Sequence, residues 1–147
     1  MAWTTITRSC GHPDRVQLIG PYRERERKAA YLATITCEIC RLEAGQQTAH
    51  AQQAQGMAAL RGTPKQIAWA ATIRRAQLAA IDRLLGTIAA GHAQAELADT
   101  SYTLLRQEAS CSWWIEHRDD SPQALLAIRI REIQALRGKV LQHDTIT

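Results

Sequence analysis

β-Branched and apolar residues near the N-terminus predict a β-hairpin over residues 3–20. Residues 4–7 and 16–19 are the two candidate strands, because Thr, Ile and Val favour extended backbone. Between them, the run Cys-Gly-His-Pro forms a tight turn in which Gly11 can adopt a positive φ. A Gly-Pro pair then ends the hairpin.

Helical patterns fill most of the remaining chain. The spacing predicts a helix over residues 23–35, and its alternating Arg/Glu start is typical of a solvated face. A second helix begins at Thr63 and Pro64, an N-cap followed by a favourable first residue, and its apolar positions recur every three or four residues to about Ala90, with Gly91 as the stop.

Two more helices are predicted near the C-terminus. One begins at Asp99 or Thr100 and continues through the two adjacent tryptophans to about Arg118. Ser121 and Pro122 repeat the start signal, and apolar residues at helical spacing extend the last helix to about residue 140. Short connections between three helices predict a small antiparallel bundle.

The predicted fold is mostly α with a small β-hairpin: a zinc-ribbon-like module followed by a three-helix domain. The module covers residues 1–42, a Gln- and Ala-rich linker with possible helical character covers 43–62, and the bundle covers 63–147. The pattern predicts neither a membrane span nor a signal peptide, so we expect a cytoplasmic protein. In that compartment paired cysteines are more often metal ligands than disulfides.

Four residues have the spacing of a zinc site. Cys10 and His12 form one short pair, and Cys37 and Cys40 form the other. Four protein ligands would close the coordination shell, which favours a structural Zn²⁺ over a catalytic one. The alternatives are a redox pair at Cys37 and Cys40, or unligated thiols. A redox pair would follow a strand rather than a helix.

The segment CGHPDRVQLIGPYRERERKAAYLATITCEIC resembles the Cys-Gly-His…Cys-x-x-Cys region of uncharacterised bacterial and phage or plasmid zinc-ribbon proteins. GTPKQIAWAATIR and SWWIEHR resemble helical motifs that accompany that region in the same family. These stretches cover most of residues 8–40, 62–75 and 112–118. The resemblance implies a zinc-ribbon-like element and a helical domain, and it implies no established activity.

The formal net charge of +4 permits contact with nucleic acid without requiring it. A tryptophan flanked by cations could stack on a base while the cations hold phosphates. The first group of binding candidates is Lys65, Trp69, Arg74 and Arg75. The alternative is that Trp69 packs in the bundle core, since large aromatics dominate cores and the chain contains no Phe.

Trp113 and Trp114 cannot both face the same way on a helix, because neighbouring residues lie about 100° apart. We expect one ring inside and the other at a boundary or an interface. Trp114 and Arg118 are the second binding candidates, with Arg118 one turn later and able to stack on that ring.

The sequence contains no recognisable catalytic constellation, and Cys111 and the other histidines are isolated. The first functional hypothesis is a non-enzymatic, zinc-containing binding protein of mobile-element type that docks on nucleic acid or a nucleoprotein complex. The second is a protein–protein inhibitor of a host defence complex, similar in kind to anti-CRISPR proteins. The third is an enzyme with an unrecognised site. No small-molecule substrate and no membrane partner are indicated.

Overall fold

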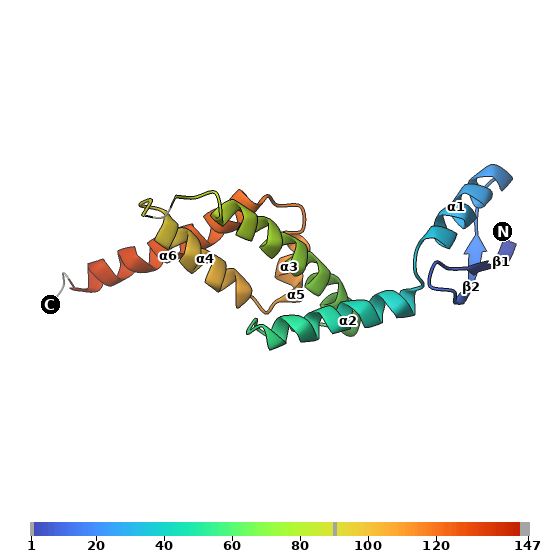
Figure 1. Ribbon diagram of the computed structural model, residues 1–147, viewed down its shortest axis with the longest axis horizontal. Helices are drawn as coiled ribbons and strands as arrows, with labels where there is room; N and C mark the ends of the chain where they lie inside the picture. Colours follow the sequence, from blue (N-terminus) through green and yellow to red (C-terminus); the bar gives the residue numbers. More distant parts are fainter. Residues whose placement is uncertain (1, 90, 145–147) are drawn as a thin grey trace. The chain divides into compact units, whose positions relative to one another are not determined.

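The computed structural model describes residues 2–89 and 91–144, and the chain divides into two compact units (Figure 1). The N-terminal unit is Met1–Ala44 and the helical unit is Gly45–Thr147. Along the described residues, no helix combines the length and the apolar composition needed to cross a bilayer.

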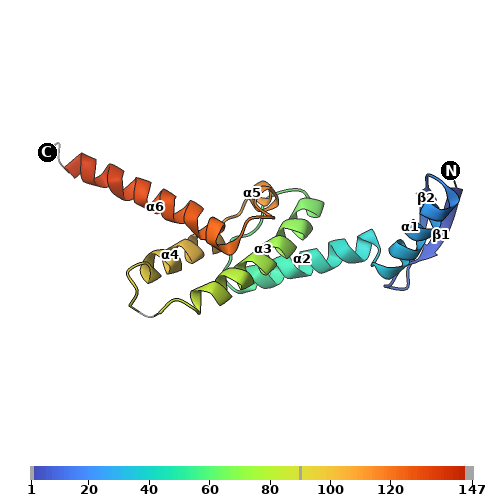
Figure 2. The same cartoon turned by 90° about the horizontal axis from the view of Figure 1, so that it is seen from above.

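The predicted hairpin is confirmed in the N-terminal unit. Strand β1 (Ala2–Thr7) pairs antiparallel with β2 (Pro13–Leu18), in a register that sets Trp3 opposite Gln17 and Thr5 opposite Arg15. Helix α1 (Tyr22–Thr34) contacts both strands, and the views from two directions agree on this (Figures 1 and 2). The predicted helix over residues 23–35 is therefore confirmed to within a residue at each end.

The N-terminal unit has a very small core. Its buried apolar side chains are Ile6, Leu18 and Cys37, and α1 contributes no buried residue. Arg8 is also buried, where it donates to Asp14 at 2.9 and 2.5 Å and to the carbonyl oxygen of Leu32 at 3.2 Å. A unit of this size buries too little apolar surface to fold securely by itself, so we expect it to need a further cross-link.

Helix α2 (Glu38–Ala54) occupies much of the segment expected as a linker. In the helical unit it packs closely on the next helix. A Cβ atom added at Gly45 would lie 2.4 Å from the Cβ atom of Ala68, so the absence of a side chain is what permits this approach. Gln52 is buried and donates to the carbonyl oxygen of Ala71 at 2.8 Å. This part of the segment thus belongs to a packed structure.

Helix α3 (Pro64–Leu85) begins as predicted. Thr63 caps it: the amide of Gln66 donates to the Thr63 hydroxyl at 3.2 Å, and the amide of Thr63 donates to the Gln66 side chain at 3.0 Å. The helix ends at Leu85, before the predicted end at Ala90, which lies outside the described residues.

The single helix predicted from Asp99 or Thr100 to about Arg118 is wrong. The structure has two helices there, α4 (Ala95–Arg106) and α5 (Cys111–Glu116). The chain between them is held by long-range pairing, with the Arg61 amide donating to the Ala109 carbonyl at 2.8 Å and the Cys111 amide to the Arg61 carbonyl at 3.2 Å. Ser110 then caps α5.

Helix α6 (Pro122–Asp144) completes the helical unit. α3 contacts α4, α5 and α6, and α4 contacts α6 (Figure 1). The core lies among these helices, with Trp114 as its largest fully buried side chain; its indole nitrogen donates to the Glu108 carbonyl at 3.0 Å. Other fully buried members of this core are Ala70, Ala71, Ile81, Leu105, Cys111 and Leu125.

Candidate metal centre

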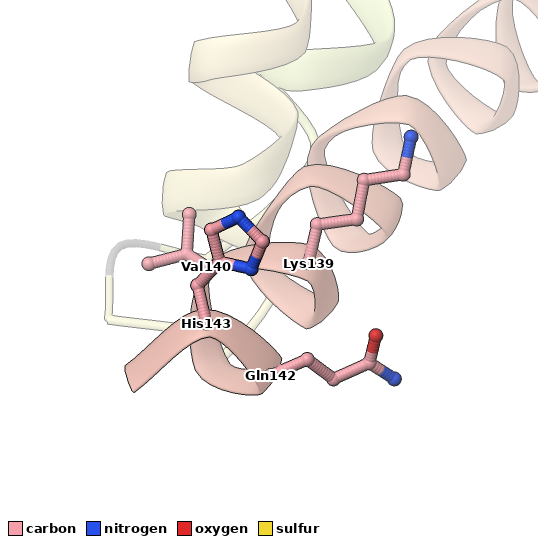
Figure 3. A pocket seen from close by; sticks show the side chains of 4 residues that line it. All are labelled: Lys139, Val140, Gln142 and His143. Atoms are coloured by element: carbon pink, nitrogen blue, oxygen red, sulfur yellow. The ribbon is translucent and has the colours of Figure 1, made fainter. Parts of the chain in front are cut away.

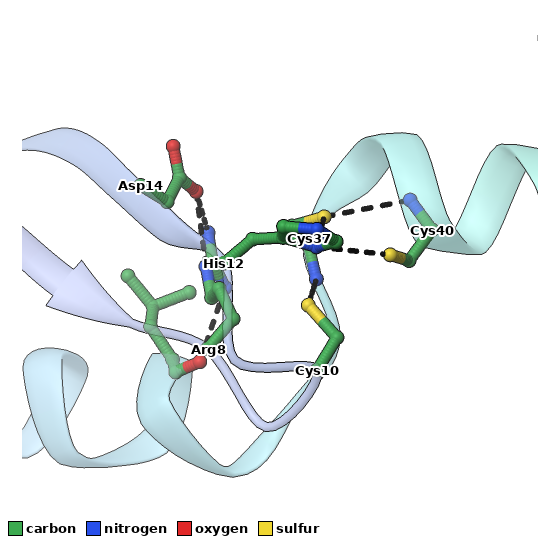
Figure 4. A network of polar contacts seen from close by, with 7 residues as sticks. Arg8, Cys10, His12, Asp14, Cys37 and Cys40 are labelled. Atoms are coloured by element: carbon green, nitrogen blue, oxygen red, sulfur yellow. Dashed lines mark hydrogen bonds and ion pairs between the residues drawn. The ribbon is translucent and has the colours of Figure 1, made fainter.

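The two predicted ligand pairs come from different parts of the N-terminal unit. Cys10 and His12 lie in the turn between β1 and β2, where the Arg8 amide donates to the His12 carbonyl at 3.0 Å and the Gly11 amide donates to the Arg8 carbonyl at 2.9 Å. Gly11 has a φ of 83°, the left-handed conformation that glycine adopts without strain. This backbone geometry aims both ligands of the turn to one side (Figure 4).

The second pair lies where α2 begins. Cys37 directly precedes the helix and Cys40 lies in its first turn. The Ser9 amide donates to the Ile35 carbonyl at 3.1 Å, which ties the turn to the chain entering α2. The three cysteines and the histidine consequently face one another, and Figure 4 shows the contacts among them.

The four ligand atoms lie within 4.8 Å of one another. His12 Nδ1 is 3.3 Å from Cys40 Sγ and 3.8 Å from Cys37 Sγ. In a zinc tetrahedron with bonds of about 2.3 Å to sulfur and about 2.1 Å to nitrogen, a sulfur and a nitrogen are about 3.6 Å apart. The two measured distances fall on either side of this value. The cluster could therefore hold a metal ion such as zinc.

Backbone amides also support ionised sulfur. The Cys37 amide donates to Cys10 Sγ, and the Cys40 amide donates to Cys37 Sγ, each at 3.4 Å. The hydrogen bond from the Cys37 backbone is the main reason that the pKa of Cys10 falls to about 6. The neighbouring Cys37 thiol acts in the opposite direction on Cys40 and raises its pKa to about 12. Adjacent thiolates repel one another, and a bound cation removes that repulsion.

Burial differs among the four ligands. Cys37 is buried, Cys10 and Cys40 are half-buried, and His12 is exposed. A cavity of about 430 Å³ adjoins the cluster, with Arg8, His12 and Cys37 in its lining. The cluster is thus open to solvent on the His12 side, so a chelator can reach it.

The structure brings together part of the first group of predicted binding residues. Trp69 is 51% exposed, so the alternative that its ring fills the bundle core is wrong. The Arg118 guanidinium lies over the Trp69 ring, 5.7 Å from its centroid. Lys65, one turn earlier on α3, and Arg75 are exposed as well.

Two predicted binding residues are instead core residues. Arg74 is fully buried, where its Nε donates to Gln52 at 2.8 Å and its Nη1 donates to the Ala58 carbonyl at 2.8 Å. Trp114 is also fully buried, so its assignment to an interface is corrected. Arg118 stacks on Trp69 rather than on Trp114, because Trp114 points into the core and leaves no exposed ring face.

Further aromatic–cation pairs were not found from the sequence, among them one on the hairpin and one in the helical unit. The Arg15 guanidinium lies 5.2 Å from the centroid of the Trp3 ring on the hairpin. The Arg129 guanidinium lies 4.8 Å from the Trp113 centroid, and Arg129 is also paired with Glu108. The alternation of side chains along a strand is a sequence signal for the pair of Trp3 and Arg15, since it places both residues on one face of the hairpin. The second pair carries no comparable local signal.

No protein-family model, no curated protein and no solved structure matches this chain. What supports the expected resemblance to zinc-ribbon proteins is the Cys/His cluster beside a β-hairpin, which indicates a metal-binding module. The family itself and a mobile-element origin stay predictions.

Proposed function

We propose that this chain is a non-enzymatic nucleic-acid-binding protein whose N-terminal unit is stabilised by a structural Zn²⁺. The Cys₃His donor set, the small core of the N-terminal unit and the ligand spacing support zinc in a structural role. With four protein ligands, the ion would have no open position at which to activate water.

The observation that carries the binding proposal is the exposed Trp69 ring with Arg118 beside it. Both side chains were predicted from sequence as binding residues, and the fold places them together although they belong to different elements. Stacking of a base on an aromatic ring contributes about 1–3 kcal/mol and tolerates any base. Lys65, one turn before Trp69 on the exposed side of α3, adds a further cation for a phosphate.

The contacts of the Arg118 guanidinium within the protein leave it able to bind a phosphate. Its Nη1 donates to the Ile115 carbonyl at 2.8 Å, and its Nε lies 3.7 Å from the Asp119 carboxylate, whose side chain is 91% exposed. An ion pair this exposed contributes little, so a phosphate can displace Asp119 at small cost. Arg118 would then hold the phosphate of the nucleotide whose base stacks on Trp69.

The experiment is a titration of fluorescein-labelled DNA and RNA with the zinc-loaded protein at several salt concentrations. We expect affinity to fall as salt rises, since bound phosphates release counterions. Trp69→Ala should weaken binding by about tenfold or more, and Arg118→Gln should reduce the salt dependence by about one phosphate contact. Arg131→Gln, at an exposed position of α6, is the matched control.

Salt-independent binding, or no binding to any nucleic acid, overturns the proposal. A Trp69→Ala protein that binds as tightly as the parent overturns the assignment of the binding site to Trp69. Zinc is tested separately by elemental analysis, which should find one ion per chain in the parent and none after Cys40→Ser.

A second candidate function, a protein-binding inhibitor or adaptor, is favoured by the end of α6. Leu136, Val140 and Leu141 are 63%, 61% and 69% exposed there, an unusual concentration of apolar surface on one helix end. Figure 3 shows Val140 and His143 close together with Lys139 beside them, around a shallow pocket.

The charge around Leu136, Val140 and Leu141 indicates which kind of protein partner would bind there. Arg137 and Lys139 flank them, and the sequence between Ile133 and His143 contains no Asp or Glu. A second copy of the same helix end would bring like charges together, so the fitting partner is an acidic amphipathic helix of another protein. Loss of capture of a synthetic acidic amphipathic peptide on Val140→Asp would support this function. Unchanged capture, or none by the parent, would contradict it.

A further inference from the structure

The outer face of the hairpin carries a second exposed tryptophan. Along β1 and β2, inward residues such as Ile6 and Leu18 are buried, and residues of opposite parity are exposed except Gln17, which is half-buried. Trp3, Thr5 and Arg15 lie on the exposed side, with Trp3 at 59% exposure. The strand register explains this, because alternate side chains of a strand point to opposite faces.

Trp3 and Arg15 form a stacked pair on this face. In the ladder Trp3 is opposite Gln17 and Thr5 is opposite Arg15, so Arg15 is the diagonal neighbour of Trp3. Its guanidinium lies over the ring at 5.2 Å from the centroid, which leaves the other side of the ring open to solvent. Arg15 forms no ion pair within the part of the chain that the structure describes.

The charge on the two faces of the hairpin differs. The carboxylate in the strands belongs to Asp14, which accepts from Arg8 at 2.9 Å on the inner side. The outward positions of the strands hold aromatic, hydroxyl, amide and cationic groups and one proline, and none carries a carboxylate. These outward positions are Trp3, Thr5, Thr7, Pro13, Arg15 and Gln17. This combination suits a polyanion with flat bases better than an apolar protein surface.

We propose that the outer face of the hairpin binds single-stranded nucleic acid, with a base stacked on Trp3 and the adjoining phosphate held by Arg15. Thr5 and Thr7 provide hydroxyl donors along the path of the strand. A duplex does not fit, because its bases are paired and stacked on one another and cannot lie flat on a side-chain ring. The inference rests on the proposed function for the ligand class, but its residues differ from Trp69 and Arg118.

The hairpin site depends on the metal centre. The turn that joins β1 to β2 holds Cys10 and His12, so loss of the ion releases the constraint on the strand pairing. The Trp69 site lies in the other unit, which has a larger core of its own. Chelation should therefore remove the contribution of Trp3 and leave that of Trp69.

The test uses the full-length zinc-loaded chain and a fluorescein-labelled oligothymidylate, with a DNA duplex of equal length as the comparison ligand. Trp3→Ala should weaken binding of the single strand by about tenfold, and Arg15→Gln should reduce the salt slope by about 0.7. Duplex binding should not change. Tyr31→Ala, which removes a 63% exposed ring from α1, is the matched control and should bind like the parent. Trp3→Phe should retain part of the affinity.

The Trp3→Ala and Trp69→Ala variants separate this inference from the proposed function. If Trp3→Ala retains zinc and parental affinity while Trp69→Ala loses affinity, the hairpin inference is overturned and the proposed function stands. If only Trp3→Ala loses affinity, the hairpin site stands and the Trp69 site is wrong. If the parent binds neither ligand, both are wrong. Equal weakening of single-strand and duplex binding by Trp3→Ala overturns the stacking mechanism.

Discussion

The Nε atom of Arg74 donates a hydrogen bond of 2.8 Å to the side-chain oxygen of Gln52, and both residues are buried. Gln52 uses its amide group to donate to the Ala71 carbonyl, so a single side chain joins α2 to α3 at two points. Arg74, whose burial lowers its pKa, donates to two neutral oxygens, those of the Gln52 side chain and the Ala58 carbonyl. The guanidinium is therefore held by neutral oxygens, and Gln52 provides one of them.

Replacing Gln52 with Ala should destabilise the helical unit by about 2–3 kcal/mol. The substitution removes an acceptor from a buried charged group and removes the side-chain donor to the Ala71 carbonyl. Gln53→Ala, at the exposed neighbouring position of α2, should change the free energy of unfolding very little. Chemical denaturation, monitored by circular dichroism, measures the free energy of unfolding of both variants. Equal stability of the two variants would show that the buried pair does not hold α2 in place.

Replacing Cys40 with Ser, or chelating the metal, should unfold the N-terminal unit and spare the helical unit. The N-terminal unit buries few apolar side chains, whereas the helical unit has an extensive core. Hydrogen exchange should become fast over the hairpin and α1, while the Trp114 region stays protected. Cys111→Ala is the control for zinc content, since Cys111 is buried in the helical core outside the cluster. Unchanged exchange in the hairpin after metal loss would mean that the ion is not structural.

Replacing Trp114 with Ala should cost about 3–5 kcal/mol, the range for a large buried aromatic. The ring is fully buried and its indole nitrogen is hydrogen-bonded to Glu108. Trp69→Ala is the matched substitution of an exposed ring, and its melting temperature should stay close to that of the parent. If Trp114→Ala leaves the melting temperature unchanged but weakens ligand binding, the ring belongs to an interface after all.

Replacing Gly45 with Ala should destabilise the helical unit by about 1–3 kcal/mol, although alanine is the better helix former. The new Cβ atom would lie 2.4 Å from the Ala68 Cβ and 2.6 Å from the Ala68 Cα, so α2 and α3 must separate. Gly138→Ala on α6 meets nothing within 4 Å and should be stabilising by about 0.5–1 kcal/mol. Thermal unfolding of the two variants should therefore shift in opposite directions, and shifts of the same sign would refute close packing at Gly45.

Local sequence signals, which act over a few residues, were sufficient to predict much of the fold and the Cys/His cluster. The Thr63 cap, the hairpin and its positive-φ Gly11 follow from local backbone chemistry. The ligand spacing at Cys10 and Cys37 was enough to predict the cluster, because a chelating pair needs only a short chain between its members. The break between α4 and α5 was missed, since the backbone there pairs with Arg61, far away in the sequence.

The sequence by itself therefore determined the hairpin, the starts of α3 and α6 and the four residues of the Cys/His cluster, all of which depend on neighbours along the chain. The tertiary structure decided which cations and aromatic rings are accessible. Arg74 is buried, with its Nε and Nη1 hydrogen-bonded to Gln52 and Ala58, whereas Trp69 is exposed and has Arg118 beside it. Burial depends on what faces a residue across the helix packing, and the composition of a single helix does not contain that information.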